Sequence, residues 1–399
     1  MMVVLLGLGS CKPEEPIVPT TNTELVGTLT ENKTLTADKV WTLKGYVYVP
    51  EGITLTIEAG TKITSDVTKK GALCIERGGK IYANGTAEQP IVFTSGQSSP
   101  KPGDWGGVIL LGNAPTNKPD PTIEGGVGRH YGGIDENDNS GVLRYVRVEY
   151  AGIAAFPGSE INAFTFGGVG KGTVVDYCES YYANDDAFEF FGGNVNCSHL
   201  IAVGTADDDY DFDFGYVGTI KFAISKRDPL FVDMADAGNG IECDNDGTGS
   251  FATPVTNPKL NNFTLIGPND PSSLPNHNLA MRWRRATNFT VQYSIFYGYM
   301  KGGFSIESDG TAQSFIDGSS IMYNNYISSV DTINTVKTSS TLLTKDVMLN
   351  KTKSQGSIVT SSQVKPFDDN FQTNSTMVNG QWGAIPSGSS VWTLGWTKF

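Results

Sequence analysis

The sequence contains no stretch of about 20 apolar residues, so no helix of this chain is expected to span a membrane. Charged residues make up only 18% of the chain, and no segment carries an apolar stripe at helical spacing for three turns. A stripe rich in lysine and arginine is also missing, and the net charge is −13, which argues against nucleic acid as a partner. An acidic surface holds a polyanionic glycan only through a bridging cation or a local basic patch.

The five cysteines include no CxxC pair, so a zinc site is not expected. Four of them would permit two disulfides in an oxidising compartment, but their spacings match no known disulfide framework. These four are Cys74, Cys178, Cys197 and Cys243. We expect them to be single buried thiols.

The amino end differs from the rest of the chain. Residues 1–10 form a short apolar run that ends in small residues, and Leu8-Gly9-Ser10-Cys11 resembles a bacterial lipobox, although no lysine or arginine precedes the run. The resemblance implies a signal peptide over residues 1–10 and lipidation of Cys11. Residues 11–24 are rich in proline and threonine and predict an extended tether. We therefore expect a lipid-anchored protein of the outer membrane, on the cell surface. The alternative is a buried N-terminal strand with a chance cysteine.

Short β-rich runs return along the chain at a nearly regular interval. They start at residues 141, 172, 194, 218, 262 and 288, so the steps are 31, 22, 24, 44 and 26 residues. A step of 22 to 24 is one turn of a three-sided β-coil. The step of 44 is interpreted as two coils, and the step of 31 as one coil with an inserted loop around residues 155–160. An antiparallel sandwich would instead predict hairpins at a spacing of about 8–12 residues.

The repeat predicts an all-β protein, a right-handed single-stranded parallel β-helix with long loop insertions. We place the β-helix at residues 25–327 and the C-terminal coils and cap at residues 328–399, anchored by Trp382, Trp392 and Trp396. Residues 95–136 and 228–259 are rich in glycine, proline or aspartate, and are predicted to project as irregular loops.

Two acidic phrases lie on consecutive coils. Aligning them places Asp185 over Asp207, Asp186 over Asp208 and Glu189 over Asp211, in each case 22 residues apart. Parallel stacking brings such residues to about 4.8 Å, where like charges repel. Ca²⁺ can neutralise them, backbone N–H groups of the turns can, or one carboxyl can keep a raised pKa and act as a general acid. The candidate metal ligands are Asp185, Asp186, Glu189, Asp207, Asp208, Asp211 and Asp213.

Aromatic rings beside this ladder are candidates for stacking on a sugar. The candidate ligand contacts are Tyr210, Tyr216, Trp283 and Arg284. The alternative is that the rings stack inside the β-helix and that the arginines of the MRWRR run pair with nearby acids. The Asp185-Asp186 doublet resembles that of polygalacturonase-type glycosidases, but their Gly-His-Gly element has no counterpart here. Pectate lyases use Ca²⁺ with an arginine or lysine base, for which this run is a candidate.

Four phrases together resemble a family of bacterial right-handed parallel β-helix surface lipoproteins, pectate-lyase-like in fold and without an assigned activity. They begin at Trp41 (WTLKGYVYVPEGITLTIEAGT), Gly103 (GDWGG), Asn184 (NDDAFEFFGG) and Asp207 (DDDYDFDFGY). The resemblance implies the fold and an envelope location. Three functions stay open. The chain is a non-catalytic surface protein that binds a glycan or an outer-membrane protein, a polysaccharide lyase or glycoside hydrolase, or a structural or adhesive spacer.

Overall fold

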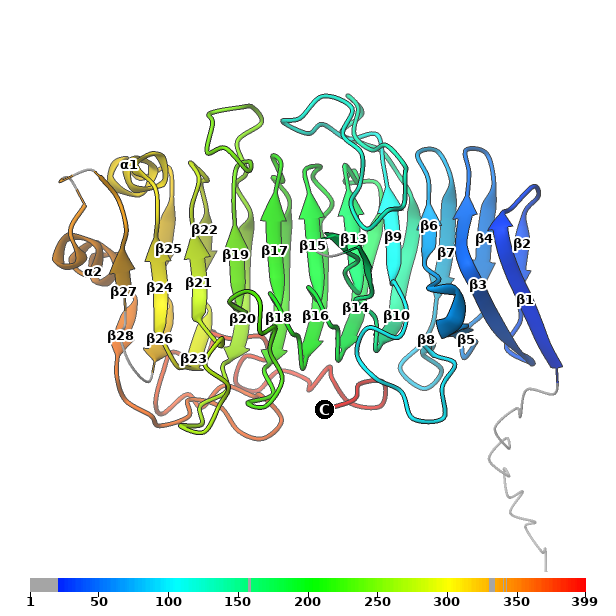
Figure 1. The fold of residues 1–399 in the computed structure, drawn as a ribbon. Coiled ribbons are helices and arrows are strands. Elements are labelled where there is room, and N and C mark those ends of the chain that lie inside the picture. Colours follow the sequence, from blue (N-terminus) through cyan, green and yellow to red (C-terminus); the bar gives the residue numbers. More distant parts are fainter. Residues whose placement is uncertain (1–20, 157–158, 330–333, 340, 342) are drawn as a thin grey trace, which may run out of the picture.

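The computed structural model describes residues 21–399 except 157–158, 330–333, 340 and 342 (Figure 1). The chain winds as a solenoid in which every strand of the large 26-stranded sheet pairs in parallel with strands of the neighbouring coils. Apolar residues alternate along most strands and point into one shared interior, so no coil buries its apolar face without the next. The predicted parallel β-helix is confirmed.

Each coil contributes to three ladders, named here in the order in which the chain enters them. The first ladder contains β2 (Lys33–Leu35), β4 (Thr54–Ile57), β7 (Lys80–Asn84), β22 (Thr290–Gln292) and β25 (Ile321–Tyr323). The second ladder contains β1 (Thr21–Thr28), β5 (Lys62–Ser65), β8 (Ile91–Ser95), β23 (Ile295–Tyr299), β26 (Tyr326–Ser329) and β28 (Ile358–Thr360). The third ladder contains β6 (Leu73–Ile75), β9 (Val108–Leu111), β13 (Phe164–Gly167), β15 (Phe188–Phe191), β17 (Tyr210–Asp213), β19 (Ile241–Cys243), β21 (Leu279–Trp283), β24 (Gly302–Ile306) and β27 (Asn334–Val336).

The remaining strands of the large sheet bend from one ladder into the next. Those that run from the first ladder into the second are β10 (Gly141–Glu149), β14 (Val174–Tyr181), β16 (Cys197–Val203), β18 (Thr219–Lys226) and β20 (Lys259–Ile266). β3 (Lys39–Val49) runs from the second ladder into the third, and the end of β1 follows it there, with Gly27 opposite Val47.

The corner between the first and second ladders is a single residue in the left-handed region of the backbone. It is Tyr145 in β10 (φ 49°), Tyr177 in β14 (φ 54°), His199 in β16 (φ 53°) and Phe222 in β18 (φ 58°). Side chains other than glycine seldom adopt such φ values. Here the rings stack along the solenoid, with centroids 4.4, 4.1 and 5.3 Å apart from one pair to the next. Stacking between coils offsets the backbone cost of the bend.

Stacked rings also fill the interior behind the third ladder. Phe164, Phe188 and Tyr210 lie one above another with centroids 4.9 and 5.5 Å apart, and all three are fully buried. Successive residues of a strand point to opposite faces. The residue that follows each of these rings in β13, β15 and β17 therefore points to the outer face. The four internal cysteines are free and buried, as predicted.

Two sequence interpretations of the coils are corrected. β18 pairs directly with β20, with Thr219 opposite Lys259, so the step of 44 residues is one coil with insertions and not two coils. The two stretches predicted to be irregular each contain a buried strand, β9 and β19. These strands are only four and three residues long, so they are hard to recognise in the sequence between glycine-rich loops. The inserted loop around residues 155–160 is present as an antiparallel hairpin of β11 (Ala154–Phe156) and β12 (Ser159–Glu160).

The C-terminal region departs from a simple end cap. Two helices that were not predicted, α1 (Asp309–Asp317) and α2 (Lys345–Ser354), lie at the far end of the solenoid (Figure 1). In the described part of the chain, no helix has the length and apolar character needed to cross a membrane. The last residues then return along the flank, where the ring of Trp396 meets Tyr145 and Tyr177 edge-on. Trp382 and Trp396 are buried there and Trp392 is half-buried, so these tryptophans anchor a flanking segment.

Candidate functional site

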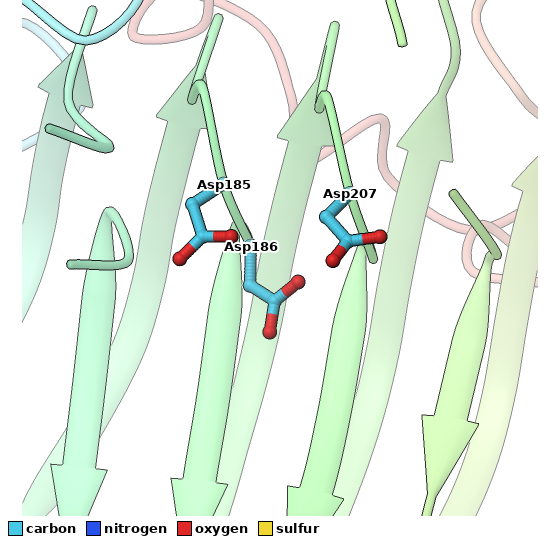
Figure 2. Close-up of side chains that lie close together, drawn as sticks. All are labelled: Asp185, Asp186 and Asp207. Carbon is cyan, nitrogen blue, oxygen red and sulfur yellow. The ribbon is translucent and has the colours of Figure 1, made fainter. Parts of the chain in front are cut away.

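The acidic residues lie on the outer face of the third ladder. In β15 and β17, Phe188 pairs with Tyr210 on the inside and Glu189 pairs with Asp211 on the outside, so the register predicted from the sequence is confirmed. The turns that precede these strands carry Asp185 with Asp186 and Asp207 with Asp208. Figure 2 shows the carboxyl groups of Asp185, Asp186 and Asp207 on one side of two neighbouring coils.

Two of the carboxylates stabilise the turns. Asp186 Oδ1 accepts a hydrogen bond from the backbone N–H of Asp208 at 2.8 Å, and Asp208 Oδ1 accepts from both the backbone N–H and the side-chain amide of Asn239. Asn162 occupies the same position one coil before Asp186. The row therefore stacks Asn, Asp, Asp and Asn, and the turn-capping role proposed for these aspartates is present for Asp186 and Asp208.

Beyond turn capping, the carboxylates predicted as metal ligands lie close together and form no ion pair with a described residue. Asp185, Asp186 and Asp207 each place an oxygen within 4.8 Å of the others, and so do Asp186, Glu189 and Asp211, so that Asp186 belongs to both groups. Within the described residues, none of the seven predicted metal ligands forms an ion pair. Hard cations such as Ca²⁺ take several carboxylate oxygens in such an arrangement.

Burial, together with the neighbouring carboxylates, raises the proton affinity of the whole group. Burial, followed by the neighbouring carboxylates, raises the pKa of Asp186, Glu189 and Asp211 well above its usual range. Burial also raises the pKa of Asp207 to about 7 and that of Asp213 to about 8. Without a cation, several of these groups hold protons near neutral pH.

Glu124 and Asn162 complete the site, and the sequence did not single out Glu124. Glu124 belongs to the long loop between β9 and β10, and the Asn162 amide nitrogen donates to Glu124 Oε1 at 3.2 Å and to Glu189 Oε2. The oxygen of the same buried amide, Asn162 Oδ1, has no hydrogen-bond partner in the described residues. No pattern marks Glu124, because a loop of that length has no repeat that would place it.

Comparison with protein families matches residues 27–397 to the family described as pectate-lyase like beta helix domain. The chain belongs to this family. Neither the curated proteins nor the solved structures contain a match. The match covers the solenoid from the end of β1 onward and nearly all of the flanking C-terminal segment, so the acidic site lies inside the pectate-lyase-like domain.

In this pectate-lyase-like domain the predicted aromatic contacts are corrected. Tyr210, Tyr216 and Trp283 are each 0% exposed. The hydroxyl of Tyr210 donates to the backbone of Ile224 at 2.8 Å, and the ring of Trp283 stacks on Phe289 at 4.2 Å. An inward position on a coil buries the ring whatever lies beside it in sequence, so these three residues are core residues.

The arginines of the MRWRR run pair with nearby acids, as the alternative interpretation of the sequence predicts. Arg284 Nε lies 2.8 Å from Asp244 Oδ1, and another guanidinium nitrogen pairs with Glu242. Arg282 lies between Glu242 and Glu307 at 2.9 and 3.1 Å. Because its guanidinium group is paired with these carboxylates, Arg284 lies at the positively charged edge of the acidic row. It is not an unpaired cation available to a ligand.

Proposed function

We propose that the pectate-lyase-like domain is non-catalytic and binds Ca²⁺ at the acidic site, through which it holds an acidic glycan. The two groups of carboxylate oxygens within 4.8 Å, which have no ion pair in the described residues, carry this proposal. The unpartnered Asn162 Oδ1 supplies a further neutral oxygen in the same site. Asp185, Asp207 and Asp211 are only half-buried, so an ion held by them stays accessible to a ligand.

A bound cation also explains which glycan the domain would hold. The net charge of −13 repels a polyanion from most of the surface. Ca²⁺ at the third ladder reverses the sign of the charge locally and can share its open coordination positions with the carboxylates of a uronic acid polymer.

Calcium binding is expected to be lost when Asp186 is replaced by asparagine. Asp186→Asn removes a charge shared by both groups, yet its amide oxygen can still accept the hydrogen bond from Asp208. Asparagine already occupies this row one coil before Asp186, as Asn162, and two coils after it, as Asn239. Isothermal calorimetry on the chain from Thr20 would show heat for the unaltered protein and none for Asp186→Asn. Asp369→Asn, on the exposed C-terminal segment where Asp369 pairs with Lys365, is the control and should bind as the unaltered protein does. Absence of heat in the unaltered protein would remove the calcium site.

The glycan is tested with polygalacturonate and alginate, with and without Ca²⁺. Binding of either polymer by the protein that depends on Ca²⁺, with no change in polymer length, supports the proposal. Shortened polymer would support the alternative of a lyase or hydrolase, which the raised pKa of Asp207 and Asp213 favours because a protonated carboxyl at neutral pH can act as a general acid. Binding of Ca²⁺ without either polymer would favour a protein partner or a spacer role.

Lipid anchoring is a separate part of the proposal. Cys11 and the tether up to Thr20 lie outside the described residues, so the support comes from the lipobox-like sequence alone. We expect Cys11→Ala to abolish incorporation of labelled palmitate and to release the protein from outer-membrane fractions, whereas Cys74→Ala, a buried thiol, should change neither. Cleavage of the chain by protease added to whole cells would place it on the outer face. Unchanged labelling of Cys11→Ala would rule out the anchor.

A further inference from the structure

A groove of 460 Å³ lies at the corner between the first and second ladders, where the C-terminal segment passes along the solenoid. Its lining includes Tyr177, His199, Phe222, Asn262, Gln381 and Trp392. The acidic site is on the third ladder, so the two sites are separate. The volume lies within the range of sites that hold small organic ligands.

One wall of the groove is the end of the aromatic corner row. Phe222 stacks on His199 with centroids 5.3 Å apart, and the next coil in the register places Asn262 where another ring would continue the stack. Asn262 has the same left-handed backbone (φ 57°) as Phe222 (φ 58°). The ring stack therefore stops at Phe222, and the space beyond its ring is part of the groove.

The opposite wall is fixed in place by hydrogen bonds. The side-chain amide of Asn262 donates to the backbone oxygens of Gln381 and Gly383 at 2.8 and 3.1 Å. The ring nitrogen of Trp392 donates to the backbone oxygen of Ala384 at 3.0 Å. The Trp392 ring stands at 72° to that of His199, with centroids 4.9 Å apart. Two aromatic surfaces at a steep angle thus bound a preformed cleft.

Apart from Ala384 and Pro386, the rest of the lining that the structure describes is polar without being acidic or cationic. Asn262, Gln381, Ser389 and Ser390 offer amide and hydroxyl groups, and the lining contains no aspartate, glutamate, lysine or arginine. A sugar ring has an apolar face of C–H groups and a rim of hydroxyls, which matches aromatic surfaces flanked by uncharged hydrogen-bonding groups. We propose that this groove binds a neutral glycan, with one pyranose ring packed against Phe222 and Trp392. This goes beyond the calcium site and does not depend on it.

The test uses cellohexaose, xylohexaose and mannohexaose with the full chain in the presence of EDTA, which removes Ca²⁺ from the acidic site. At least one hexasaccharide should bind with a Kd of about 1 mM or tighter by calorimetry and should change the tryptophan fluorescence. Phe222→Asn should weaken this binding at least about tenfold, because the stacking surface is lost. The substitution keeps a residue that accepts the left-handed backbone, as Asn262 does one coil away.

Tyr293→Asn is the matched control. Tyr293 has the same left-handed backbone (φ 54°) but does not line the groove, so its replacement should leave the affinity unchanged. Ser390→Trp, which fills the groove without altering the corner, should abolish binding and serves if Phe222→Asn does not fold. No binding of any of the three sugars at about 10 mM would overturn the proposal. So would equal binding by a folded Phe222→Asn variant. Because EDTA is present throughout, either result leaves the calcium proposal standing.

Discussion

Replacing Arg227 with methionine is expected to lower the free energy of unfolding by about 3–5 kcal/mol, the usual cost of removing one partner of a buried ion pair. Arg227 and Asp209 have side chains 0% and 1% exposed and lie 3.1 Å apart. The substitution would leave the buried carboxyl of Asp209 without its cation, with neutral hydroxyl groups such as those of Ser225 and Tyr299 left as donors. Chemical denaturation of the two proteins would measure the difference.

Arg227 also holds the turn that carries the acidic site. Its guanidinium donates to the backbone oxygens of Thr205 at 3.0 Å, Asp207 at 2.7 Å and Asn239 at 2.6 Å. Its Nε donates to Nδ1 of His277, which stays neutral because burial, with a smaller contribution from Arg227, lowers its pKa to about 4. With the backbone oxygen of Ala206 at 3.3 Å, four backbone oxygens would lose a partner together, so we expect calcium binding to weaken along with stability.

Arg77→Met is the control for charge removal. Arg77 lies 3.1 Å from Asp120, but the two side chains are 36% and 63% exposed, so this surface pair should contribute less than about 1 kcal/mol. A double variant, Arg227→Met with Asp209→Leu, should recover part of the loss because no buried charge is left alone. If Arg227→Met were as stable as Arg77→Met, the buried pair would not hold the turn.

The fold was predictable because its signal is repeated. Each coil restates the same short strands, and the register that stacks Glu189 on Asp211 follows from a spacing that the sequence shows directly. The coil that includes β19 was miscounted because two insertions lengthen it, and its strand of Ile241–Cys243 offers only three residues. Helix α1 was missed for a similar reason, since nine residues give only about two and a half turns of periodicity.

The site was predictable only where it follows the repeat. Spacing places Asp186 over Asp208, but it does not reveal whether a ring such as Tyr210 points inward, because an aromatic beside an acidic residue can occupy either face of a strand. Glu124 and Arg227 reach the site from loops, and loops follow no period. The aromatic groove depends on residues 381–392 folding back on the flank, a contact between residues about 120–215 positions apart that no local pattern encodes.

Without Ca²⁺, the protein is expected to lose stability as the pH rises from about 4 to about 8. Burial raises the pKa of Asp207 from 3.8 to about 7 and that of Asp213 from 3.8 to about 8. Over this range the folded chain keeps protons that the unfolded chain has released, so the free energy of unfolding falls with pH, by about 1.4 kcal/mol for each unit by which one group is shifted. Denaturant titrations in EDTA at pH 5 and pH 8 would show a difference of several kcal/mol.

Calcium should reverse this trend, because it replaces the protons as the positive charge among the carboxylates. At pH 8, Ca²⁺ at 100 times its Kd should restore about 2.7 kcal/mol, whereas at pH 5 protons compete and the gain should shrink. Asp213→Asn removes a carboxyl outside both groups of close oxygens, so it should stabilise the calcium-free protein at pH 8 and leave calcium binding in place. Asp186→Asn should stabilise the calcium-free protein too, but lose the response to Ca²⁺. A calcium-free protein that is equally stable at pH 5 and pH 8 would show that folding does not raise the pKa of these carboxyls, and the physical reason for a cation at this site would be gone.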